Sequence, residues 1–127
     1  MKVKIPVSIG ELFDKISILE IKKEKITQPD KLLHVLHEYK KLIRVALKID
    51  ENFHKKRLYK NLKKCNSFLW EVEDAKREHE RNKDFGEKFI YWARQVYIKN
   101  DERAKIKSSL NKYYKSDIVE VKSHKKY

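Results

Sequence analysis

The chain has 127 residues, with 32 Lys or Arg against 19 Asp or Glu, and a formal net charge of +13. This length fits one domain, residues 1–127, and two glycines with two prolines leave few of the tight turns that a strand-rich sandwich needs. Cys65 has no disulfide partner, no apolar run approaches the ~20 residues of a membrane span, and no signal peptide is evident, so we expect a reduced, cytoplasmic protein with no membrane partner.

The pattern of apolar residues predicts four helices between two short strands. The expected helices cover about 9–26, 29–49, 53–82 and 85–115, and the expected strands cover about 2–7 and 117–122. A capping box, Ser8-Ile9-Gly10-Glu11, marks the start of the first helix. Polar and apolar residues alternate up to Pro6 and again after Asp117, which is typical of strands. We therefore expect an all-α antiparallel four-helix bundle with a long helical hairpin, plus a two-stranded ribbon that joins the termini.

Two apolar stripes on the third and fourth expected helices come into register when the chain folds back about Asp84. The stripes consist of Leu58, Leu62, Cys65, Leu69, Val72 and His79, and of Phe85, Phe89, Trp92, Val96, Ile106, Leu110 and Tyr113. In this register Phe89 meets His79, and Arg103 meets Cys65. The cations Lys76, Lys99 and Arg103 interrupt the apolar pattern. A buried guanidinium without a partner would cost several kcal/mol, so we expect a group that satisfies Arg103.

Polar residues gather beside these stripes, halfway along the expected hairpin. They are Asn66, Trp70, Glu73, Arg77, Tyr97, Lys99, Asn100, Arg103 and Lys107. One interpretation is an internal network in which Glu73 or Asp14 pairs with Arg103. The other is a binding pocket for an anionic ligand, such as a nucleotide or a sugar phosphate, with Trp70 as a stacking face.

A second basic region, residues 54–64, contains no acid and predicts a polyanion surface. Its proposed contacts are Lys56, Arg57, Lys60 and Lys64. Neutralisation of phosphates by such a surface would give salt-sensitive binding without sequence readout. The alternative is a solvated lysine face that reflects composition alone.

Two pairs of acids offer an enzymatic alternative. Glu11 with Asp14, and Glu71 with Asp74, each place two carboxylates on one helical face. All-helical nucleotide pyrophosphohydrolases hold Mg²⁺ with similar pairs. The simpler interpretation is a capping acid and surface ion pairs such as Glu11–Lys15.

Four segments of the chain carry a resemblance to known proteins: the opening Pro6-Val7-Ser8-Ile9-Gly10-Glu11-Leu12-Phe13-Asp14-Lys15 and residues 66–74, 96–107 and 119–123. Together they resemble a family of short proteins of unknown function that occur in bacteria, often near sugar-transfer genes, and in phages. The resemblance implies one intact domain in a sugar-related or phage setting, and it implies no activity.

The leading hypothesis is a non-enzymatic binding protein for an anionic small molecule or polyanion. The alternatives are a Mg²⁺-dependent nucleotide hydrolase and a scaffold that dimerises. No cofactor is expected, except Mg²⁺ under the enzymatic alternative.

Overall fold

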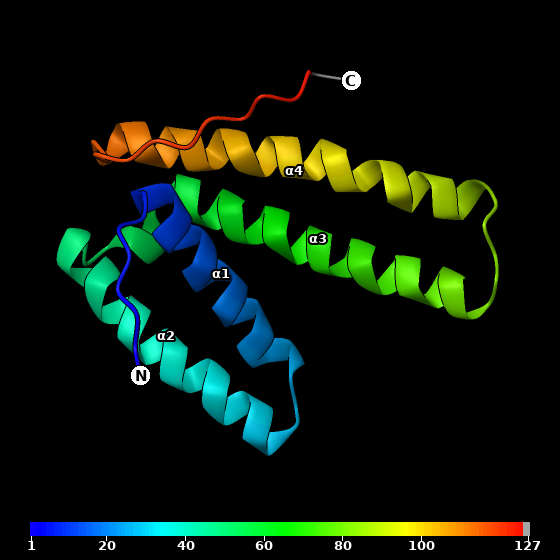
Figure 1. The fold of residues 1–127 in the computed structure, drawn as a ribbon, viewed down its shortest axis with the longest axis horizontal. Helices are drawn as coiled ribbons and strands as arrows, with labels where there is room; N and C mark the ends of the chain where they lie inside the picture. Colours follow the sequence, from blue (N-terminus) through cyan, green and yellow to red (C-terminus); the bar gives the residue numbers. More distant parts are fainter. Residues whose placement is uncertain (126–127) are drawn as a thin grey trace.

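The computed structural model describes residues 1–125 and contains four α-helices in two antiparallel hairpins (Figure 1). The helices are α1 (Ile9–Lys25), α2 (Pro29–Ile49), α3 (Arg57–Arg81) and α4 (Glu87–Tyr113). A 3₁₀ turn, η1 (Phe53–Lys55), lies between α2 and α3, so the third helix begins at Arg57 rather than near residue 53. The all-α class expected from the sequence is confirmed.

The predicted two-stranded ribbon is wrong, because residues 1–125 contain no strand. The N-terminal segment is extended and exposed. The C-terminal segment, residues 115–125, runs back along α4 instead of pairing with the N-terminal segment (Figure 1). Alternating side chains specify a strand only where one face is buried. Here Val3 is 74% exposed and Val121 is 89% exposed, so neither segment has a face to bury. Side-chain contacts hold the C-terminal segment to α4 instead, including an ion pair of Lys122 with Asp101.

The four helices of the structure do not pack on one another evenly. α1 packs on α2, α3 and α4, whereas α2 packs mainly on α1. The α3/α4 hairpin continues well past α1 and α2, and its turn end lies away from both (Figure 1). A chain with one central helix and a projecting hairpin buries less of α2 and of the hairpin than a closed bundle would.

The core lies where α1 crosses the root of the hairpin, the end opposite its turn. Its centre is aromatic: the ring of Phe13 lies 5.0 Å from that of Phe53 and 5.3 Å from that of Tyr114. The other buried members come from all four helices and are Leu12, Ile16, Ala46, Tyr59, Leu62 and Leu110. Burial of these side chains is the main stabilising term, at about 1.5–3 kcal/mol for each large apolar residue.

The hairpin keeps the predicted pairing near its turn, where the rings of His79 and Phe89 lie 6.2 Å apart. Further along, the Cys65 thiol donates to the carbonyl oxygen of Lys99 at 3.3 Å, and Lys99 lies one helical turn from Arg103, the residue predicted to meet Cys65. The turn itself needs a left-handed residue, and Lys83 provides it with φ of 52°. The apolar stripes therefore do face each other across α3 and α4.

Gly10 allows α1 to approach α4 closely. Its N–H donates to Asn111 Oδ1 at 2.7 Å. A Cβ atom at this position would lie 2.6 Å from the carbonyl oxygen of Lys107, closer than real Cβ contacts come. The first turn of α1 is therefore fixed against the last turns of α4.

Candidate functional site

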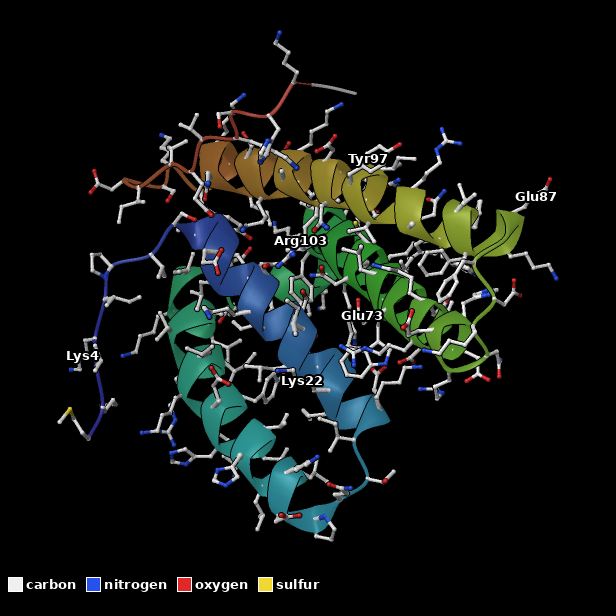
Figure 2. All side chains as sticks on the ribbon, turned by 45° about the vertical axis from the view of Figure 1, so that its right-hand side comes forward. Lys4, Lys22, Glu73, Glu87, Tyr97 and Arg103 are labelled. Carbon is white, nitrogen blue, oxygen red and sulfur yellow. The ribbon has the colours of Figure 1, made fainter. Side chains whose placement is uncertain are left out.

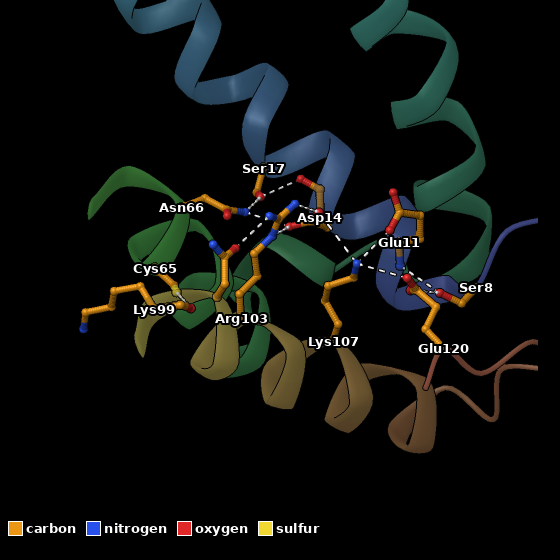
Figure 3. A network of polar contacts seen from close by, with 11 residues as sticks. Ser8, Glu11, Asp14, Ser17, Cys65, Asn66, Lys99, Arg103, Lys107 and Glu120 are labelled. Atoms are coloured by element: carbon orange, nitrogen blue, oxygen red, sulfur yellow. Dashed lines mark hydrogen bonds and ion pairs between the residues drawn. The ribbon is translucent and has the colours of Figure 1, made fainter. Parts of the chain in front are cut away.

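Arg103 forms a buried ion pair with Asp14 rather than facing an open cavity (Figure 3). Its Nε donates to Asp14 Oδ1 at 2.9 Å, and its second terminal nitrogen contacts Asp14 Oδ2. Asp14 is 1% exposed and also accepts from Asn66 Nδ2 at 2.9 Å, while the same amide reaches Ser17 Oγ at 2.8 Å. The hydrogen bonds that Arg103 donates to Asp14 outweigh partial burial and raise the pKa of Arg103. The sequence offered Glu73 and Asp14 as partners for Arg103, and in the structure Arg103 pairs with Asp14.

Lys107 extends this network to the C-terminal segment. Its Nζ lies 2.7 Å from Glu11 Oε2 and 3.4 Å from Glu120 Oε2. Glu120 in turn accepts from the Ser8 hydroxyl at 2.9 Å (Figure 3). Burial lowers the pKa of Lys107, but the contacts with the surrounding carboxylates outweigh it, so the pKa lies above its ordinary value. The ammonium group thus links α1, α4 and the C-terminal segment.

Asn100 also belongs to the network, since its side-chain oxygen accepts from Arg103 at 3.3 Å. The remaining predicted ligand residues lie apart from it. Glu73 and Arg77 form an exposed pair at 2.9 Å on the surface of α3. Tyr97 is exposed and Trp70 is half-buried.

Lys99 is engaged separately. Its ammonium group pairs with Glu102 at 3.0 Å and stands 4.9 Å above the ring of Phe68. The predicted cluster therefore divides into an internal network and several surface contacts.

The four acids of the enzymatic alternative do not converge. Glu11 holds Lys107 and Asp14 holds Arg103, whereas Glu71 and Asp74 are exposed on α3. Across residues 1–125 no three His, Cys, Asp or Glu side chains are grouped closely enough to hold a metal ion.

Sequence reasoning missed a second, half-buried carboxylate with several hydrogen-bond donors, Glu20. It accepts from the hydroxyl of Tyr39 at 2.9 Å and from that of Tyr59, and it lies 2.8 Å from Nε2 of His54. Burial raises the pKa of Glu20, but these hydrogen bonds outweigh it and leave the pKa below its ordinary value. Burial, together with the hydrogen bond that Tyr39 donates to Glu20, raises the pKa of Tyr39 to about 12. One signal was available: Glu20 follows the buried Phe13 by seven residues, which places an acid on the inner face of α1.

A pocket of about 420 Å³ opens beside Glu20, and we refer to it as the lysine pocket. Its walls come from α1, η1 and α3, and they comprise Glu20, His54, Tyr59, Lys60, Lys63, Lys64 and Ser67. Lys63 lies 3.7 Å from Glu20 and 3.0 Å from Glu24, while Lys60 and Lys64 are exposed at the rim. Three lysines thus line one depression beside Glu20, and one of them, Lys63, is also paired with Glu24.

The structure brings together only part of the predicted polyanion surface. Lys60 and Lys64 line the lysine pocket, whereas Lys56 turns toward Asp50, at 4.0 Å, and the ring of Tyr113. Arg57 is exposed and does not line the pocket.

A larger groove of about 760 Å³ runs between α4 and the C-terminal segment, but its charges are balanced. Lys122 pairs with Asp101 at one end, and Lys107 pairs with Glu120 at the other. The groove therefore lacks the excess of cations found in the lysine pocket.

Comparison with known proteins places the chain in a family without assigning it an activity. No curated protein and no solved structure was found to match it. Within the described part of the chain, none of the helices has the length and apolar character to cross a membrane. A model for a family of unknown function, DUF6165, matches residues 1–126. The setting near sugar-transfer genes or in phages stays an expectation. Because the match covers nearly the whole sequence, the chain belongs to this family of unknown function, DUF6165.

Proposed function

We propose that the protein binds a phosphate-bearing ligand in the lysine pocket, without catalysing a reaction on it. The observation that carries the proposal is the convergence of Lys60, Lys63 and Lys64 on one depression of about 420 Å³. This volume lies within the range of about 300–1,000 Å³ typical of small-molecule sites. Ammonium groups are compact donors that suit phosphate oxygens.

The carboxylate in the pocket wall does not oppose an anion as strongly as its charge alone suggests. Glu20 already accepts hydrogen bonds from two tyrosines and contacts His54, so its charge is spread over several donors. Lys60 and Lys64 are exposed residues that line the same pocket. Their ammonium groups would provide the positive charge that a bound phosphate group needs.

The internal network around Arg103 is a weaker candidate for the ligand site. An anion at Arg103 would have to displace Asp14, a carboxylate that is 1% exposed and tied to Asn66. Leaving that charge buried and unpaired would cost several kcal/mol. The balance of charge therefore favours the lysine pocket over the hairpin cluster predicted from the sequence.

The proposal can be tested with inorganic triphosphate as the probe, at low ionic strength, by calorimetry and thermal denaturation. Triphosphate at about 100 times its dissociation constant should stabilise the wild type by ~2.7 kcal/mol. Replacing Lys60 and Lys64 by glutamine should weaken binding at least tenfold. The matched control replaces Lys40 and Lys41, exposed lysines on α2, and removes the same charge away from the pocket.

A control variant that binds within about twofold of the wild type would support a local site. Equal losses in the two variants would show a response to net charge alone and would refute the pocket. Absence of binding by the wild type at ~50 mM salt, where phosphate contacts are strong, would refute it as well. If triphosphate fails but single-stranded RNA binds with a steep salt slope, the extended polyanion surface replaces the pocket.

A further inference from the structure

The turn end of the α3/α4 hairpin, residues 71–97, is only two helices thick, and we refer to it as the hairpin tip (Figure 1). Val72 is the only buried residue among residues 71–97. Two helices can bury the line along which they meet, but each keeps an outer face. The hairpin tip therefore has large apolar side chains that the chain itself does not cover.

The exposed apolar side chains lie along α4 and in the turn that precedes it. Phe85 is 49% exposed, Ile90 54%, Tyr91 51% and Tyr97 44%. Ile90 and Tyr97 are seven residues apart and so share one face of α4. Arg94 lies between them on that face and donates to the Tyr97 hydroxyl at 3.4 Å.

The hairpin tip is also the part of the molecule where charge is balanced. Residues 71–97 contain seven acids and six bases, for a net charge of −1. Because the whole chain carries +13, the other residues together carry +14. Acids and bases alternate on its surface, for example in the pair of Glu73 with Arg77 and in the pair of Glu78 with Arg81. Such a surface is complementary to a copy of itself, as a twofold interface requires.

We infer that the hairpin tip is a self-association surface and that its partner is a second copy of this chain. A contact between two copies through the residues outside the hairpin tip would bring together two regions that each carry a net charge of +14. Tip-to-tip contact keeps these regions apart, because the part of α4 in the tip, residues 87–97, spans about 16 Å at 1.5 Å per residue. That length exceeds the screening distance of ~8 Å at physiological ionic strength. Figure 2 shows Glu87 at the free end of α4, far from Lys4 and the N-terminal segment.

Analytical ultracentrifugation across a concentration series tests the inference. The wild type should form a dimer in the micromolar range, and higher salt should not dissociate it. Replacing Ile90 and Tyr91 by glutamine removes apolar surface without changing charge, and should weaken the dimer at least tenfold. The control replaces Leu33 and Leu47, which are 68% and 44% exposed on α2, and should leave the dimer constant within about twofold.

Hydrogen exchange provides a second readout that does not depend on a substitution. Dimer formation should slow amide exchange in residues 87–97 and leave α2 unchanged. A wild type that stays monomeric at ~200 μM, or a dimer that protects α2 and is lost in the Leu33/Leu47 variant, would overturn the inference. Neither Ile90 and Tyr91 nor Leu33 and Leu47 line the lysine pocket. A failure of ligand binding and a failure of dimer formation can therefore be told apart.

Discussion

Replacing Arg103 by methionine should destabilise the protein strongly, although an apolar residue would continue the apolar stripe that Arg103 interrupts in the sequence. The substitution leaves Asp14 as a carboxylate that is 1% exposed and without its cation. Removing one partner of a buried ion pair typically costs about 3–5 kcal/mol. Arg103 itself is 28% exposed, so some water reaches the pair, and we expect the lower end, about 3 kcal/mol.

The loss should be recovered in part when the acid is neutralised as well. Asparagine at position 14 is uncharged, and its side-chain oxygen can still accept from Asn66. We therefore expect the double variant, Asp14→Asn with Arg103→Met, to be more stable than the sum of the two single changes predicts. The interaction energy should be about 2 kcal/mol, within the range of residues in one network.

Urea denaturation at neutral pH measures each member of this cycle. Arg77→Met is the control, because Arg77 pairs with Glu73 where both side chains are more than half exposed, and such i,i+4 pairs contribute about 0.3–0.5 kcal/mol. Two results would refute the reasoning. One is an Arg103→Met variant no less stable than the control, and the other is strict additivity in the cycle.

Three further changes test other parts of the structure. Gly10→Ala should lower the free energy of unfolding by about 1–3 kcal/mol in thermal denaturation, because its Cβ would clash with a backbone carbonyl, whereas Gly86→Ala meets only an ordinary contact at 3.5 Å and should have little effect. The folded pKa of Glu20 lies below its ordinary value of 4.5, so its ionised form stabilises the fold fully above that pH and the contribution is lost as pH falls through the folded pKa. The stability difference between wild type and Glu20→Gln should therefore shrink on acidification from pH 6 to 3, and a constant difference would contradict the role of Glu20. Burial raises the pKa of the Cys65 thiol to about 11, so a thiol reagent at pH 8 should modify the folded protein at least tenfold more slowly than the urea-unfolded chain.

The parts of the fold that could be predicted from sequence are those with a local or periodic cause. The register of His79 with Phe89 follows from two apolar stripes and one turn, both readable within a single hairpin. Ser8 was identified as a cap from a pattern of four residues, and its hydroxyl does accept from the Glu11 N–H at 3.0 Å. Such signals need no knowledge of distant contacts.

The parts that could not be predicted depend on which elements meet across the whole chain. Glu20 gathers its donors from α2, η1 and α3, and no spacing rule connects those segments. The alternation after Asp117 is a genuine strand signal, but it lacks a buried face and a partner strand, so it gives an extended segment instead. Arg103 was recognised as needing a partner, yet only the crossing of α1 over the hairpin selects Asp14 over Glu73.

The contacts at the start of α1 have a consequence for the order in which the chain can fold. The N–H groups of Ile9 and Gly10 donate to Ser116 and Asn111, and the Ser8 hydroxyl donates to Glu120, all more than 100 residues away. On a ribosome, these partners emerge more than 100 residues after α1 begins, so the first helix is made long before its N-terminal turn can be completed. The α3/α4 hairpin, by contrast, pairs neighbouring segments and can form as soon as it emerges. Native docking of the first turn of α1 therefore waits for the end of α4 and the segment that follows it, and the first helix of the bundle is fixed in place after the hairpin.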